Sequence, residues 1–180
     1  MSQTDIILAG FGGQGILFAG KLVAYFGLLR GMEVSWLPSY GPEMRGGTAN
    51  CSVCLSDRAV GSPLILEPDA LMVMNAPSFR KFIGTVKPGG LAVIDSALIS
   101  DTCDRNDIGV YYIPATRLAM DNGMEGMANI IMVGKLLRET GLASDPSELA
   151  EAIDKCVPAS KKHLIEANTR AVALGMSYKE

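Results

Sequence analysis

Two glycine-rich segments of this chain contain the residues whose types and spacing best suit the binding of an anion. The first is Gly10-Phe11-Gly12-Gly13-Gln14-Gly15, and the second extends from Ser39 to Gly47. Glycines let backbone N–H groups approach a ligand closely, and the guanidinium group of Arg45 offers a planar fork of donors to a carboxylate or phosphate. The candidate ligand-binding residues in these segments are Gly12, Gly13, Gln14, Gly15, Ser39, Tyr40, Glu43, Arg45, Gly46 and Gly47. For Glu43 and Arg45, an ion pair within the loop is the alternative interpretation.

The first segment matches the pattern G-x-G-x-x-G, which is typical of dinucleotide-binding folds when it joins a strand to a helix. Such a site also needs an Asp or Glu at the tip of the second strand, to bind the ribose hydroxyls. That strand ends here at Leu37-Pro38 without an acid, and Glu33 lies at its opposite end. The missing acid disfavours a nicotinamide or S-adenosylmethionine site. A free-standing nucleotide-dependent enzyme and a packing turn without a ligand both stay open as alternatives.

The residue types that most often carry catalysis are poorly placed in this chain. The single histidine, His163, lies in a helical segment far along the sequence from both glycine-rich segments. Cys51 and Cys54 have C-x-x-C spacing, but on a strand their thiols point to opposite faces, and no second pair accompanies them. We therefore expect neither a catalytic residue nor a metal site, and we predict that the chain does not catalyse a reaction alone.

Alternating apolar runs and helical segments predict the framework that positions the two glycine-rich segments. We expect strands at residues 5–10, 32–37, 48–55, 70–74, 91–94 and 110–113, and helices at 14–29, 77–83, 124–140, 147–156 and 160–174. This order predicts an α/β fold in which residues 1–180 form a single-domain three-layer sandwich, with a mostly parallel, Rossmann-like sheet and a helical C-terminal third. In such a sheet, ligands gather beyond the carboxyl ends of the strands, where both glycine-rich segments fall.

The composition narrows the classes of partner. The net charge of −3 provides no basic surface for nucleic acid. No apolar run reaches the roughly eighteen residues that span a bilayer, and no signal peptide precedes the first strand. The four cysteines lack the spacing of a disulfide framework, which favours a cytoplasmic location.

Hydrophobic residues make up 48% of the chain and charged residues 19%, which indicates that a partner covers part of its surface. Residues 16–29 and 127–137 form helical segments that are apolar nearly all round. A helix of this kind must be covered on several sides. The two segments therefore form either a central layer of the domain or a subunit interface.

Taken together, Ile7-Leu8-Ala9-Gly10-Phe11-Gly12-Gly13-Gln14-Gly15 and Ser39-Tyr40-Gly41-Pro42-Glu43-Met44-Arg45-Gly46-Gly47 resemble the gamma subunit of 2-oxoacid:ferredoxin oxidoreductases. The resemblance extends over the whole chain, including Lys87-Pro88-Gly89-Gly90 before a strand and the helical C-terminus. The longer form of the second segment, through Thr48-Ala49-Asn50-Cys51, is most similar to the 2-oxoglutarate branch. The branched-chain 2-oxoacid and pyruvate branches stay open.

The resemblance implies a subunit of an enzyme that oxidatively decarboxylates a 2-oxoacid to an acyl-CoA and passes electrons to ferredoxin. It implies thiamine diphosphate, Mg²⁺ and iron–sulfur clusters on partner subunits, no cofactor bound by this chain alone, and coenzyme A at a site shared between subunits. The implied partners are alpha and beta subunits, with a delta subunit left open, and ferredoxin through the complex. A homodimer of the isolated chain is one further alternative. A purely structural subunit, whose glycine-rich segments serve only as contacts, is another.

Overall fold

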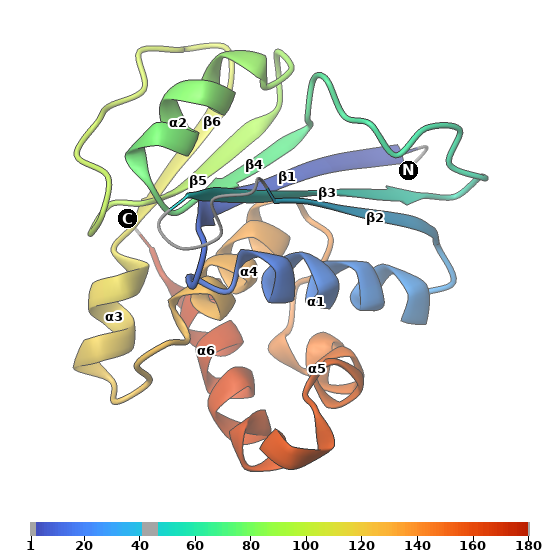
Figure 1. Cartoon of the computed structure of the whole chain (residues 1–180), viewed down its shortest axis with the longest axis vertical. Helices are drawn as coiled ribbons and strands as arrows, with labels where there is room; N and C mark the ends of the chain where they lie inside the picture. Colours follow the sequence, from blue (N-terminus) through green and yellow to red (C-terminus); the bar gives the residue numbers. More distant parts are fainter. Residues whose placement is uncertain (1–2, 41–46, 180) are drawn as a thin grey trace.

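The computed structural model describes residues 3–40 and 47–179 of the chain. Six strands form one sheet in the order β2-β3-β1-β4-β5-β6 (Figure 1). The strands are β1 (Gln3–Phe11), β2 (Glu33–Tyr40), β3 (Thr48–Ser56), β4 (Ala70–Val73), β5 (Leu91–Asp95) and β6 (Gly109–Ile113). The pairings β1–β4, β4–β5 and β5–β6 are parallel, whereas β3 is antiparallel to both β1 and β2. The predicted α/β fold with a mostly parallel sheet is confirmed.

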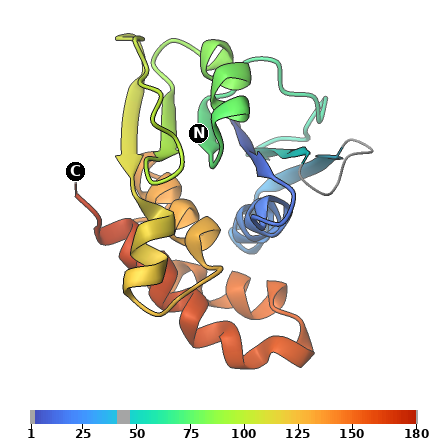
Figure 2. The same cartoon turned by 60° about the vertical axis from the view of Figure 1, so that its left-hand side comes forward.

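Helices cover the two faces of the sheet unequally. One face carries α2 (Ala76–Phe82) and a 3₁₀ turn (Ile83–Thr85), as Figures 1 and 2 show. The other face carries α1 (Ile16–Leu29), α3 (Ala115–Asp121), α4 (Ala128–Glu139), α5 (Ala150–Cys156) and α6 (Ile165–Ser177), with 3₁₀ segments η2 (Pro146–Leu149) and η3 (Ala159–Leu164). Each face has its own hydrophobic core, and the larger core lies beneath α1 and α4.

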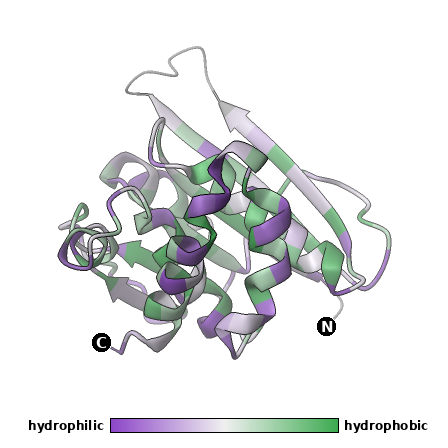
Figure 3. Ribbon diagram, turned by 90° about the horizontal axis from the view of Figure 1, so that it is seen from below, coloured by the Kyte–Doolittle hydropathy of each residue, from purple (hydrophilic) through white to green (hydrophobic). Residues whose placement is uncertain are grey.

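The two apolar helices differ in how deeply they are buried. In α4, every residue from Asn129 to Leu137 is buried, because the helix lies between the sheet and α6. This confirms the central-layer interpretation for α4. In α1, Leu28 and Leu29 are 52% and 41% exposed, so the subunit-interface interpretation stays open there. Viewed from the helical side, hydrophilic and hydrophobic stretches alternate along the helices of this layer (Figure 3).

The structure shifts several predicted boundaries and adds one helix; the helices predicted at 147–156 and 160–174 each begin as a 3₁₀ segment. The second strand was expected to end at Leu37, before Pro38, but β2 continues to Tyr40. Because β2 lies at the edge of the sheet, Pro38 occupies a position where a missing N–H is tolerated. The helix expected from residue 124 begins at Ala128, after Gly126 with its positive φ of 85°. The short helix α3, which follows β6, was not predicted.

The described helices also bear on membrane insertion. In residues 3–40 and 47–179, no helix has both the length and the apolar character needed to cross a bilayer.

Candidate functional site

The described parts of the two glycine-rich segments lie side by side, as the sequence predicted. The backbone N–H of Gly12 donates to the carbonyl oxygen of Gly47 at 3.0 Å. Phe11, at the end of β1, pairs with Thr48 at the start of β3. The antiparallel strand β3 therefore brings Gly47, the last residue of the second segment, to the carboxyl end of β1. Three candidate residues, Glu43, Arg45 and Gly46, lie outside the described residues.

The N-terminus of α1 supplies the donors of this site. Gly15 precedes the helix with a φ of 73°, and no side chain in the described part of the chain caps the helix at this position. The first turn of α1 also contains no acidic residue. The first N–H groups of a helix have no partner within it, and its dipole adds partial positive charge at this end. The turn is therefore suited to holding a phosphate or carboxylate group.

Gln14 attaches the turn to the ends of β1 and β4 through its side-chain amide. Its Oε1 accepts from the backbone N–H of Phe11 at 2.6 Å, and its Nε2 donates to the carbonyl oxygen of Met74 at 2.9 Å. Its own backbone N–H donates to the carbonyl oxygen of Phe11 at 3.1 Å. These bonds favour a positioning role for Gln14 over direct contact with a ligand.

A cavity of about 310 Å³ lies beside the turn. It is lined by Phe11, Gly12, Gly13, Gly15, Ile16, Leu17, Phe18, Gly47, Thr48 and Ala49. Among the candidate residues, Gly12, Gly13, Gly15 and Gly47 therefore share this cavity. Ser39 lies at the exposed edge strand opposite Asn50, outside the lining of this cavity. The lining combines backbone N–H donors with apolar walls, which suits binding and orientation better than acid–base chemistry.

Asp95 is the buried carboxylate at the carboxyl end of β5, and it acts within the fold. Its Oδ2 accepts from the backbone N–H and the Oγ1 of Thr116 at 3.2 and 2.6 Å, and its Oδ1 accepts from the N–H of Ala97 at 3.1 Å. Burial raises the pKa of the Asp95 carboxyl, and these hydrogen bonds oppose that effect. The carboxyl group thus attaches the start of α3 to the sheet.

The remaining titratable candidates lie away from the glycine turn. His163 is exposed in η3. The Sγ of Cys51 donates to the carbonyl oxygen of Ile16, and that of Cys54 to the carbonyl oxygen of Ser62, so the two thiols face opposite sides of the sheet as predicted. Burial raises the pKa of both thiols to about 12. Within the described ranges, no group of three or more His, Cys, Asp or Glu side chains is arranged to hold a metal ion.

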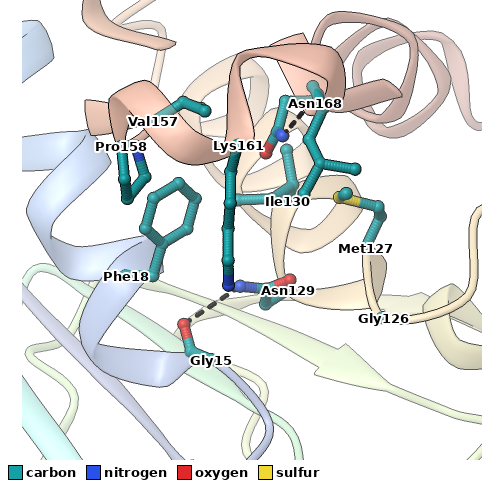
Figure 4. Close-up of a pocket in the computed structure, with 11 residues that line it drawn as sticks. Gly15, Phe18, Gly126, Met127, Asn129, Ile130, Val157, Pro158, Lys161 and Asn168 are labelled. Atoms are coloured by element: carbon teal, nitrogen blue, oxygen red, sulfur yellow. Dashed lines mark hydrogen bonds between the residues drawn. The ribbon is translucent and has the colours of Figure 1, made fainter. Parts of the chain in front are cut away.

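A second cavity on the other side of the first turn of α1 was not predicted (Figure 4). Asn129 of α4 and Lys161 of η3 line it together with Gly15. The sequence signal for this cavity was the polar residue Asn129 in the apolar first half of a helix. Nothing local in the sequence connects Lys161 with a turn that lies so far from it along the chain.

The sequence matches the family model described as pyruvate ferredoxin/flavodoxin oxidoreductase over residues 5–178. The ketoisovalerate oxidoreductase subunit VorA of Methanothermobacter marburgensis is 34% identical over 98% of this chain. The chain spans only 36% of the length of that relative. The 2-oxoglutarate synthase subunit KorC of Methanocaldococcus jannaschii is 36% identical over 87% of this chain and 84% of its own length.

Solved structures share the fold. The gamma subunit of a keto/oxoacid ferredoxin oxidoreductase from Geobacter sulfurreducens superimposes with a TM-score of 0.80 at 26% identity, over 96% of both chains. A 2-oxoglutarate:ferredoxin oxidoreductase from Magnetococcus marinus, solved with 2-oxoglutarate, coenzyme A and succinyl-CoA bound, gives a TM-score of 0.85 at 21% identity. That match covers 97% of this chain and 30% of the other, and at this identity it shows the fold alone.

Proposed function

Because this chain belongs to the pyruvate ferredoxin/flavodoxin oxidoreductase family, we propose that it is the gamma-type subunit of a 2-oxoacid:ferredoxin oxidoreductase. Residues 1–180 then form one gamma-type domain of a cytoplasmic assembly with alpha and beta subunits. One observation supports an anion-binding role for this chain. Gly12 and Gly47 are hydrogen-bonded to each other beside the N-terminus of α1, which no described side chain caps. This junction offers backbone donors to an anion, and its described residues include no group that would perform the chemistry.

The proposed reaction is the oxidative decarboxylation of a 2-oxoacid to its acyl-CoA, with electrons passed to ferredoxin. Thiamine diphosphate, Mg²⁺ and iron–sulfur clusters belong to partner subunits in this proposal. Coenzyme A is the reactant that this chain would bind, because its phosphates match the donors at the start of α1. Holding those phosphates orients the thiol toward the partner subunit where the acyl group is formed.

We favour 2-oxoglutarate as the substrate. The 2-oxoglutarate synthase subunit KorC has a length close to that of this chain, whereas the chain spans about a third of VorA. The longer form of the second glycine-rich segment also supports this branch. The alternative is a branched-chain 2-oxoacid, which the similarity to VorA supports.

The test is a purification of the tagged chain from cells that make it, followed by assays with 2-oxoglutarate, 2-oxoisovalerate and pyruvate. The proposal predicts co-purification with thiamine- and cluster-containing subunits, and coenzyme A-dependent reduction of ferredoxin that is fastest with 2-oxoglutarate. Faster turnover of 2-oxoisovalerate would identify the branched-chain alternative. Recovery of the chain without partners, together with tight binding of NAD, would overturn the proposal in favour of a free-standing enzyme.

A further inference from the structure

The second cavity lies between the N-termini of α1 and α4 and the 3₁₀ segment η3. Its volume is about 310 Å³, and its walls are mostly apolar. Phe18, Met127, Ile130, Val157, Pro158 and Leu164 form those apolar walls. Polar groups are contributed by Gly15, Asn129, Lys161 and Asn168. A space of this size with few polar groups has the character of a small-molecule subsite.

Asn129 leaves one hydrogen-bonding position open on the wall of this cavity. The residue is only 4% exposed, and its Nδ2 donates to the carbonyl oxygen of Gly15 at 3.0 Å. Its Oδ1 is buried and accepts no hydrogen bond from any residue that the structure describes. Buried polar atoms in proteins nearly always have a partner. An O–H or N–H donor of a ligand is the group that this oxygen lacks.

Lys161 adds a positive charge to the same cavity. Its side chain extends from η3 in the direction of Asn129 and Gly15 in Figure 4. The neighbouring Lys162 has a different arrangement, because its Nζ binds the carboxylate of Asp154 at 2.6 Å. The second cavity therefore suits a ligand with an apolar body, a hydrogen-bond donor and an anionic group.

The two cavities meet at the first turn of α1. Gly15 and Phe18 line both of them, and each has a volume of about 310 Å³. One cavity offers backbone donors of the glycine turn, and the other offers Lys161 and Asn129. An extended anionic ligand that passes around the start of α1 would occupy both.

We propose that the second cavity is a further compartment of the coenzyme A site and holds the phosphopantetheine arm. This inference rests on the proposed function. Lys161 pairs with the phosphate of the arm, and Asn129 Oδ1 accepts from the adjacent hydroxyl or amide N–H. The methyl groups between the phosphate and the amide pack against Phe18 and Ile130. The glycine turn then faces the nucleotide end of the same molecule.

The test uses two fragments of coenzyme A as inhibitors of the purified, assembled enzyme: 3′,5′-ADP, and S-methyl 4′-phosphopantetheine, which has no free thiol. Each fragment competes against coenzyme A in complexes that contain the wild-type chain, Lys161→Met or the matched control Lys162→Met. Methionine keeps an apolar stem and removes the charge. In Lys161→Met, the inhibition constant of the phosphopantetheine fragment rises about tenfold or more, the usual effect of losing a charge-assisted hydrogen bond. The constant for 3′,5′-ADP stays the same, and Lys162→Met changes neither.

Two results would overturn the inference while leaving the proposed function intact. One is unchanged inhibition by both fragments in Lys161→Met, in an enzyme that still requires coenzyme A. The other is an equal loss for both fragments, which would mean that Lys161 acts through general electrostatics. An assembled enzyme whose activity does not depend on coenzyme A would instead overturn the proposed function, and the inference with it.

Discussion

Asn129 of α4 donates a hydrogen bond from its Nδ2 to the carbonyl oxygen of Gly15, 114 residues earlier in the chain, at 3.0 Å. The contact joins the C-terminal helices to the glycine turn that opens α1. A Cβ atom placed on Gly15 would lie 2.5 Å from the same Nδ2. The C-terminal third of the chain therefore fixes the geometry of the candidate site as well as completing the core.

Gly15→Ala is expected to destabilise the chain more than Gly13→Ala. Both glycines have positive φ, at 73° and 99°, so an alanine at either position is strained by about 1–3 kcal/mol. Only at Gly15 does the new methyl group also clash with Asn129, whereas no atom of the described residues lies within 4 Å of a Cβ placed on Gly13. We expect the total loss at Gly15 to be about 3 kcal/mol or more. Urea unfolding of the two variants measures the difference, and equal losses would show that Asn129 does not confine the turn.

Arg45→Ala is expected to raise the apparent KM for coenzyme A about tenfold in the assembled enzyme, with little change in the KM for the 2-oxoacid. The expectation comes from the sequence, since Arg45 lies outside the described residues. Steady-state kinetics with each substrate varied in turn measure both constants. Arg58→Ala is the control, because Arg58 is exposed on the loop after β3. Unchanged KM values for both substrates in Arg45→Ala would remove Arg45 from the site.

Glu148 is expected to make the chain sensitive to acid. Arg30, followed by the backbone N–H groups of Ser144 and Asp145, lowers the pKa of Glu148 from 4.5 to about 2. The unfolded chain therefore binds a proton at this site before the folded chain does, so stability falls as the pH drops from about 4.5 toward about 2. Thermal unfolding over this range should show a smaller fall in Tm for Glu148→Gln than for the wild type. A variant at the exposed Glu151, Glu151→Gln, should behave like the wild type. Parallel curves for Glu148→Gln and the wild type would refute this role.

The four cysteines are expected to differ sharply in alkylation. Cys51, Cys54 and Cys156 are buried, and burial raises the pKa of their thiols to about 12, about 12 and about 11. Cys103 is partly exposed. At a pH of about 8, iodoacetamide should label Cys103 first in the native chain, because the thiolate is the reactive form. Peptide mass spectrometry gives the order, and early labelling of Cys51 would show that β3 is open to solvent.

Much of the fold could be predicted because parallel strands such as β4 and β5 are short apolar runs and β3 alternates apolar with polar residues. The predicted run at residues 91–94 corresponds closely to β5, and 110–113 to β6. The end of β2 was placed wrongly at Leu37, because Pro38 normally interrupts a strand and the sequence does not show which strand lies at the sheet edge. The helix α3 was missed because it is short and begins without a side-chain cap, whereas the equally short α2 begins after the capping residue Asn75 and has Pro77 in its first turn.

The candidate site was only partly predictable, for a related reason. Gly12 and Gly47 were placed together correctly, because both lie beyond the ends of predicted strands, on the side of the sheet where its parallel strands end. The contact between Asn129 and Gly15 depends on how α4 packs, which no local pattern specifies. The same is true of Lys161, which reaches the first turn of α1 only through the path of η3.

The central claim is that this chain forms part of the coenzyme A site of a larger enzyme. Amide hydrogen exchange of the assembled complex, with and without coenzyme A, tests it most directly. We predict that coenzyme A slows exchange at Gly13, Gly15 and the first turn of α1, and in the segment from Ser39 to Gly47. Slower exchange confined to partner subunits, with no change in these segments, would contradict the claim.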